Sequence, residues 1–174
     1  DQLGIEPAKV NVIHGDTDRT PYGFGTFASR SAVISGGASL LAAQKVRSKI
    51  LQIAGRLLEA SADDIELAEG VARVKGTDRL IPIEQVARAA YHRAHLFSDL
   101  GPGLSESASY DPGGTFSNAC HAAIVEVDTG TGAVKIERYV VAEDAGRLIN
   151  PMIAEGQIHG GVAQGIANAL YEEI

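Results

Sequence analysis

A long amphipathic segment between residues 32 and 60 constrains the fold of this chain more than any other feature. Its apolar or small positions recur every three or four residues: Leu40, Ala43, Val46, Ile50, Ile53 and Leu57. The opposite side carries Lys45, Lys49, Gln52, Arg56 and Glu59. This spacing predicts a helix with one buried stripe and one solvated face. Other elements of the chain must therefore cover the stripe.

The first turns of this helix contain two adjacent glycines. Gly36 and Gly37 weaken the helix, because glycine disfavours it by about 1 kcal/mol relative to alanine. They also leave room for another segment to pack closely. Ser29 or Ser31 is expected to serve as the N-cap.

Strand, hairpin and helix patterns account for much of the remaining chain. In order, they predict a strand over 10–14, a hairpin of 65–68 and 71–75, a helix over 81–94, a strand over 104–111, a hairpin within 120–144 that turns at 129–132, and a glycine-rich helix over 152–173. Hairpins dominate this order, which predicts an α+β fold: an antiparallel or mixed sheet packed with helices in a two-layer sandwich. The Gly/Pro-rich residues 98–105 are the candidate subdomain seam.

Composition excludes several classes of function. The chain has 174 residues, enough for a core in one domain or two small ones. Its formal net charge is 15 − 22 = −7 with scattered positive charges, so we expect no nucleic-acid or anionic-membrane surface. No apolar run approaches the roughly 18 residues of a membrane-spanning helix. The single cysteine, Cys120, rules out an internal disulfide framework and favours a reducing compartment, the cytoplasm.

Both ends of the chain point to a longer polypeptide. Residues 1–4 read as the end of a helix that closes on Gly4. The last residues stop inside a helical pattern. We therefore expect residues 1–174 to be a fragment that forms part of a larger domain.

The reactive residues of the chain have simpler structural explanations than catalysis. His14, Asp16 and Asp18 could face one way on an extended chain, but hard cations require more oxygen ligands than these. Such aspartates more often tie down a turn through side-chain hydrogen bonds. Adjacent Cys120 and His121 face opposite ways on a strand, so we expect a buried structural cysteine. The sequence contains no G-x-S-x-G, no complete dinucleotide fingerprint and no P-loop lysine.

The loop Gly25–Ser31 leads directly into the long helix. A glycine-rich turn followed by Ser29, Arg30 and Ser31 exposes backbone N–H groups beside a cation. That combination suits a phosphate, a carboxylate or another anionic cofactor. An ordinary N-cap, with Arg30 in a local ion pair, explains the residues equally well. Both interpretations remain open from the residues alone.

The last predicted helix is unusually rich in glycine. Gly156, Gly160, Gly161 and Gly165 leave one surface largely bare, which lets a backbone or a flat ligand approach closely. Tight helix packing is the simpler explanation of these glycines. Gln157 is the more suggestive polar residue, because it lies near the expected start of the helix.

Together these two segments resemble a known family. "GDTDRTPYGFGTFASRS" (15–31) ahead of a long helix, and "DAGRLINPMIAEGQIHGGVAQG" (144–165) later, are similar to the molybdenum-binding subunit of the molybdenum hydroxylases. That family includes xanthine dehydrogenase, aldehyde oxidase and the large chain of aerobic carbon monoxide dehydrogenase. The "GQIHGG" and "INPM" motifs lean towards the carbon monoxide dehydrogenase branch, although Asp144-Ala145-Gly146 replaces the "DCG" often found there.

The resemblance implies a cofactor and its contacts. In such enzymes molybdenum is held by the dithiolene of a pyranopterin, in bacteria usually as molybdopterin cytosine dinucleotide. Family likeness implies that Ala28, Ser29, Arg30 and Ser31 contact the pterin and that Gln157 reaches towards it. It places the catalytic glutamate outside 1–174, so no residue here is matched to the catalytic base or to a metal ligand. The fragment alone is expected to lack both cofactor and activity.

The resemblance also implies a reaction and partners. Water-derived oxygen would hydroxylate a substrate carbon or oxidise carbon monoxide, and electrons would pass to iron–sulfur and flavin subunits or domains in a homo- or hetero-oligomer. One alternative is a non-catalytic scaffold domain that kept the fold and lost the cofactor. Another is a small metal-dependent hydrolase that uses His14, Asp16 and Asp18. The residues present do not identify the substrate.

Overall fold

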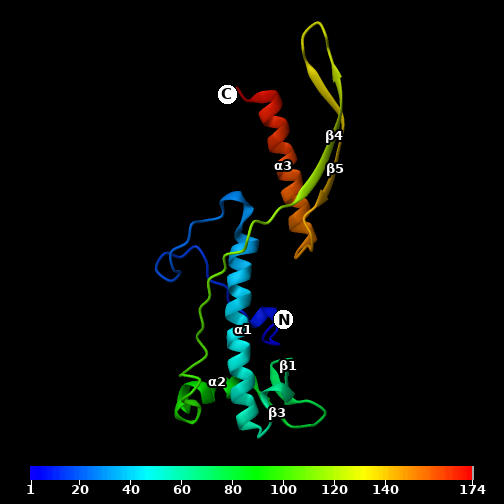
Figure 1. The fold of residues 1–174 in the computed structure, drawn as a ribbon. Coiled ribbons are helices and arrows are strands. Elements are labelled where there is room, and N and C mark those ends of the chain that lie inside the picture. Colours follow the sequence, from blue (N-terminus) through cyan, green and yellow to red (C-terminus); the bar gives the residue numbers. More distant parts are fainter. Residues whose placement is uncertain (174) are drawn as a thin grey trace. The chain divides into compact units, whose positions relative to one another are not determined.

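The computed structural model describes residues 1–173, which divide after Pro112 into two units (Figure 1). The first unit, from Asp1 to Pro112, contains α1 (Ser31–Leu57), β1 (Ile65–Ala68), β2 (Val71–Val74), β3 (Leu80–Pro82) and α2 (Ile83–His92). Its short 3-10 turns are η1 (Pro7–Lys9), η2 (Phe27–Ser29), η3 (Ala62–Asp64) and η4 (Ala94–Phe97). The second unit, from Gly113, contains β4 (Asn118–Val127), β5 (Val134–Asp144) and α3 (Pro151–Tyr171).

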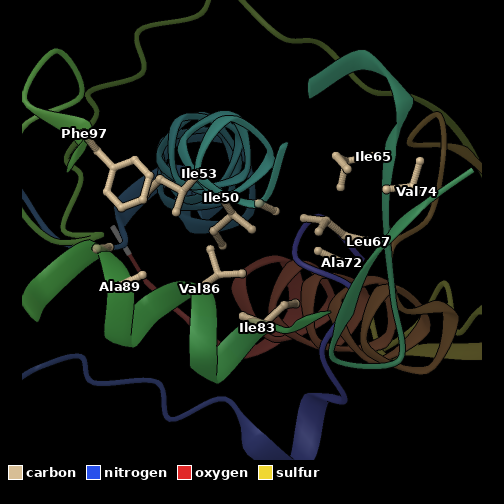
Figure 2. Packing of buried hydrophobic residues seen from close by; sticks show 12 residues of the cluster. Ile50, Ile53, Ile65, Leu67, Ala72, Val74, Ile83, Val86, Ala89 and Phe97 are labelled. Atoms are coloured by element: carbon tan, nitrogen blue, oxygen red, sulfur yellow. The ribbon is translucent and has the colours of Figure 1, made fainter. Parts of the chain in front are cut away.

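The core of the first unit lies on the C-terminal half of α1. The predicted stripe is confirmed there, because Ile50 and Ile53 are each only 1% exposed. Figure 2 shows Ile50 facing Val86 of α2 and Ile53 beside the ring of Phe97. α2 buries residues at helical spacing, namely Ile83, Val86, Ala89 and Ala90. The N-terminal half of α1 is more open, and Leu40 there is 45% exposed.

A small antiparallel sheet in the order β1-β2-β3 completes this core. β1 alternates buried and exposed residues, as a strand with one covered face should. The predicted hairpin is confirmed, with Ile65 opposite Val74 and Ala68 opposite Val71. Its two turn residues, Glu69 and Gly70, have φ of 51° and 77°. Two positive φ values are typical of the tight turn that matches the twist of paired strands.

Three local predictions were wrong. Residues 10–14 form no strand, since no strand pairs with them in the described part of the chain and they are exposed. Residues 104–111 are not a strand either and run alongside α1 instead. Neither Ser29 nor Ser31 caps α1, because Arg30 occupies the N-cap position and contributes no side-chain hydrogen bond. Residues 10–14 and 104–111 pair with no other strand within residues 1–173, and the backbone before α1 places neither serine at the N-cap.

A two-pronged ion pair ties the segment after α2 to α1. Arg56 Nη1 and Nη2 donate to Asp99 Oδ1 and Oδ2 at 2.7 and 2.5 Å. The hydrogen bonds from Arg56 lower the pKa of the Asp99 carboxyl below its ordinary value. A lowered folded-state pKa means that the pair stabilises the fold above the unfolded pKa of about 3.9 and ceases to do so as the pH falls through the folded pKa.

We therefore expect wild-type protein to exceed Asp99→Asn in stability by a small amount near pH 6, and this gap to shrink below about pH 4. Hydrogen exchange of residues 94–104 between pH 6 and 2.5, corrected for the intrinsic rate, measures the gap. Asp78→Asn is the control, because Asp78 is exposed and has no ion-pair partner among residues 1–173. A gap that stays constant with pH would contradict the assignment.

The second unit consists of one long hairpin and one helix. β4 and β5 pair antiparallel from Asn118↔Asp144 to Val127↔Val134, with a bulge between Ile124 and Val125. Asp128 closes the hairpin, since its Oδ1 accepts from Gly130 N at 2.8 Å, and this hydrogen bond lowers the pKa of its carboxyl. Asn150 caps α3 by accepting from Ile153 N. No side chain between residues 113 and 173 is buried.

The α+β class predicted from the sequence is confirmed. Both sheets are antiparallel, and each is small. The alternation of helices and hairpins follows the predicted order for α1, the first hairpin, α2, the second hairpin and α3. None of the helices within residues 1–173 is both long and apolar enough to cross a bilayer.

Candidate functional site

The segment before α1 begins with a turn built on Asp16. Its Oδ1 accepts from the N–H of Asp18 at 3.0 Å, and its carbonyl accepts from Thr20 Oγ1 at 2.5 Å. These hydrogen bonds are those of a turn stabilised by aspartate, as predicted. Among residues 1–173, no three His, Cys, Asp or Glu side chains are grouped so that they could hold a metal ion.

The backbone immediately before α1 adopts a conformation that L-residues rarely take. Ala28 and Ser29 have φ of 57° and 52°, and Gly25 has φ of 90°. A left-handed non-glycine residue costs roughly 1–2 kcal/mol, so two in succession need a compensating reason. Strained backbone of this kind clusters at ligand clamps and active sites.

Arg30 provides an isolated positive charge at this point. It is the only charged residue between Arg19 and Lys45. Its guanidinium lies 4.6 Å from the centre of the Phe27 ring and 5.8 Å from that of Phe24. Among residues 1–173 it makes no ion pair with a carboxylate. Cation–π contact therefore holds Arg30, and the alternative of a local ion pair is not what the structure contains.

The first turn of α1 is left without a side-chain cap. Ser31 Oγ donates to Thr26 Oγ1 at 3.0 Å instead of capping the helix. The first N–H groups of any α-helix have no partner within the helix. In this 27-residue helix they also stand at the positive end of the macrodipole. An anion or a hydrogen-bond acceptor from outside the helix would satisfy them.

The structure adds residues that the sequence did not assign to this site. Phe24 and Phe27 support Arg30, while Thr26 holds Ser31. The phenylalanines were detectable as unusual apolar residues in a polar loop, and both remain more than half exposed. The sequence did not indicate the role of Thr26. Its hydroxyl meets that of Ser31, five residues later, only because the turn between them brings the two together.

Gln157 lies in the second unit, on the second turn of α3, and is exposed. Ala28, Ser29, Arg30 and Ser31 all lie in the first unit. A Cβ added at Gly156, Gly160, Gly161 or Gly165 would meet nothing within 4 Å in the described chain. Tight packing within residues 1–173 therefore does not account for these glycines, and the face beside Gln157 is open.

Cys120 was expected to be a buried structural residue, and this was wrong. It is exposed on β4, and no side chain between residues 113 and 173 is buried. The neighbouring His121 engages a different partner, with Nδ1 3.2 Å from the hydroxyl of Tyr139. Cys120 and His121 thus do not form a nucleophile–base pair.

The donors present fit a polar, phosphate-bearing pterin better than a bare metal ion. Uncapped backbone N–H groups, one guanidinium and two serine hydroxyls offer hydrogen bonds and a single positive charge. The loop offers no carboxylate, thiolate or imidazole as a metal ligand between Thr20 and Gln44. An α+β chain with such a loop is suited to bind an anionic cofactor through its backbone.

Sequence comparison identifies the family. Residues 1–174 match the family described as "Molybdopterin cofactor-binding domain", and the chain belongs to that family. The resemblance inferred from the two motifs is thereby confirmed. The family assignment covers the loop Gly25–Ser31 and Gln157 alike, since both lie within the match.

Individual relatives agree with this assignment. The chain is 42% identical to the nicotine 6-hydroxylase large subunit of Paenarthrobacter nicotinovorans, covering 100% of this chain and 22% of the relative. It is 38% identical to the carbon monoxide dehydrogenase large chain of Hydrogenophaga pseudoflava, covering 99% and 22%. The structure of quinoline 2-oxidoreductase from Pseudomonas putida 86 superposes with a TM-score of 0.81 at 40% identity, covering 100% and 22%. The chain thus spans about a fifth of the length of these relatives.

Proposed function

We propose that this chain is part of the molybdenum-pterin-binding subunit of a molybdenum hydroxylase. The parent enzyme oxidises carbon monoxide, an aldehyde or an N-heterocycle with oxygen derived from water. The observation that carries this proposal is the match of residues 1–174 to the cofactor-binding family. The names of the relatives support the reaction class, since nicotine and quinoline are N-heterocycles and carbon monoxide is a one-carbon substrate.

The proposed cofactor site comprises Ala28, Ser29, Arg30 and Ser31, together with Gln157. The cofactor would be a molybdenum pterin, in the form of molybdopterin cytosine dinucleotide, which would supply the oxygen transfer and the two-electron redox change. The backbone N–H groups at the start of α1 would donate hydrogen bonds to it. Arg30 neutralises negative charge while Phe24 and Phe27 hold the guanidinium in place. Gln157 donates or accepts through its side-chain amide.

The remaining parts of the enzyme lie outside this chain. A single cysteine cannot ligate an iron–sulfur cluster, so we propose that electrons leave through iron–sulfur and flavin partners in a homo- or hetero-oligomer in the cytoplasm. The catalytic base and the substrate-facing loops also belong to segments beyond residues 1–174. Residues 1–174 alone are accordingly expected to be inactive and free of cofactor.

Substituting the proposed contacts tests the site. In full-length protein expressed with ample molybdenum, Arg30→Ala and Gln157→Ala should each reduce bound pterin about tenfold or more, because a lost hydrogen bond to a charged group costs about 1.5–3 kcal/mol. Bound pterin is measured as its fluorescent oxidation product, and molybdenum by mass spectrometry. Circular dichroism should show an unchanged fold.

Matched controls lie on the same segments. Arg19→Ala removes an exposed arginine before the loop, and Gln164→Ala removes an exposed glutamine of α3. Both controls should keep wild-type pterin. Unchanged pterin in Arg30→Ala and Gln157→Ala would refute the site assignment. Wild-type protein without molybdenum or pterin would refute the proposed function and favour a scaffold domain that lost the cofactor.

A further inference from the structure

We infer that residues 105–110 form a strap along α1 and that Tyr110, seated on Gly37, is a positioning residue for the proposed cofactor site. The inference rests on the proposed function, since it concerns how the chain is led towards the loop Gly25–Ser31. Figure 1 shows the chain after α2 returning alongside α1. The contacts that hold it there lie within the first unit.

Three contacts define the strap. Lys49 Nζ lies 3.7 Å from Glu106 Oε1, and Lys45 Nζ donates to the carbonyl of Ser107 at 2.8 Å. The third is the ring of Tyr110, which covers Gly37 so closely that an added Cβ would overlap it.

These contacts follow the helix in order. The helix positions fall from 49 to 45 to 37 while the strap positions rise from 106 to 107 to 110, so the strap runs antiparallel to α1.

The geometry explains why residues 104–111 resembled a strand. From residue 49 to residue 37, α1 rises by about 18 Å. Four residues from Glu106 to Tyr110 span about 13–14 Å when fully extended, and lysine side chains bridge the difference. The strap must therefore be nearly extended. It pairs with a helix rather than with another strand, which is why it joins neither sheet.

Two contacts hold the chain at Gly103, just before the strap. Gly103 N donates to the carbonyl of Ala90 at 2.9 Å, and an added Cβ at Gly103 would lie 2.7 Å from the ring of Tyr91. A tyrosine ring on a glycine thus fixes each end of this segment, Tyr91 on Gly103 and Tyr110 on Gly37.

The strap determines where the chain leaves the first unit. Gly37 lies six residues after Ser31, about 9 Å along the helix axis. Without the strap, the chain would leave from α2, beside the C-terminal half of α1. The strap instead carries it to the end of α1 that bears Ala28–Ser31. The first unit therefore ends, at Pro112, on the part of α1 that follows the proposed cofactor loop.

The adjacent glycines supply a matched test. An added Cβ at Gly36 would meet nothing within 4 Å, whereas one at Gly37 would overlap Tyr110. Both substitutions gain the same helix propensity. In full-length protein, Gly37→Ala should accelerate Glu-C cleavage after Glu106 about tenfold, which corresponds to about 1.4 kcal/mol of strap opening. Gly36→Ala should leave cleavage unchanged. Equal cleavage of the two variants would overturn the strap.

A double variant and the pterin content complete the test. Tyr110→Ala should also release the strap, and Gly37→Ala with Tyr110→Ala should be no worse than either single change, because one contact is lost only once. Full additivity would overturn the Tyr110–Gly37 assignment. At an unchanged unfolding midpoint, Gly37→Ala should retain less pterin than Gly36→Ala. If Gly37→Ala is cleaved faster than Gly36→Ala but the two variants bind the same amount of pterin, the positioning role is overturned.

The cleavage readout does not depend on pterin. Wild-type protein that lacks pterin refutes the proposed function and with it the positioning role, while cleavage of the glycine variants still decides whether the strap exists. The two failures are therefore distinguishable.

Discussion

Replacing Ile53 by alanine is expected to lower the free energy of unfolding of the first unit by about 3 kcal/mol. Truncating a fully buried isoleucine typically costs about 2–5 kcal/mol, because apolar contacts are lost and a cavity remains. Ile53 is 1% exposed and lies beside Phe97 (Figure 2). Hydrogen exchange of the α1 amides in full-length protein measures this free energy, since core helices open only with the surrounding unit.

Leu40→Ala is the matched control. It removes the same number of carbon atoms from the same helix, but Leu40 is 45% exposed. Leu40→Ala should lower the free energy of unfolding by less than about 1 kcal/mol, because the side chain of Leu40 buries much less apolar surface. Equal losses at Ile53 and Leu40 would contradict a core confined to the C-terminal half of α1.

Replacing Gly4 by alanine should cost the first unit about 3 kcal/mol or more. Gly4 has φ of 62°, and an added Cβ would lie 2.8 Å from the carbonyl carbon and oxygen of Leu67. A backbone neighbour cannot turn aside as a flexible side chain can. The carbonyl of Gly4 also accepts from Gly70 N at 2.7 Å. We expect the N-terminal segment to leave β1, which would expose the Gly70 amide to exchange.

Gly15→Ala separates backbone strain from the steric conflict. Gly15 has φ of 68°, but a Cβ there would meet nothing within 4 Å. Both variants pay roughly 1–2 kcal/mol for a left-handed alanine, and only Gly4→Ala adds the collision. Protection of the Gly70 amide, followed by hydrogen exchange, should fall steeply in Gly4→Ala alone. Similar losses in both variants would show that strain, not contact with Leu67, dominates.

Elements that are encoded by residues close together in the sequence were predictable. The spacing of Ile50 and Ile53 identified the buried face of α1, because helical periodicity alone decides which residues share a side. The turn at Glu69-Gly70 was predictable for a similar reason, since a two-residue turn depends on its own φ preferences. The two motifs around residues 15–31 and 144–165 sufficed to identify the family.

Features that depend on distant partners were not predictable. Residues 10–14 alternate like a strand, but no strand pairs with them in the described chain. Ser29 and Ser31 are good capping residues, yet left-handed backbone at Ala28 and Ser29 places Arg30 at the N-cap. The exposure of Cys120 likewise depends on what surrounds β4, which the residues of β4 do not encode locally.

The amino-acid sequence by itself determined the class, the long helix, both hairpins and the family of this protein, because periodicity, turn preference and motif are properties of neighbouring residues. Only the tertiary structure decided that Arg30 rests on Phe27 rather than on a carboxylate, and that Tyr110 covers Gly37. Gly37 and Tyr110 are far apart in the chain, and their contact forms only when residues 105–110 fold back along α1. Contacts of this kind depend on how all parts of the chain pack together, so the residues near Gly37 or Tyr110 do not specify them alone.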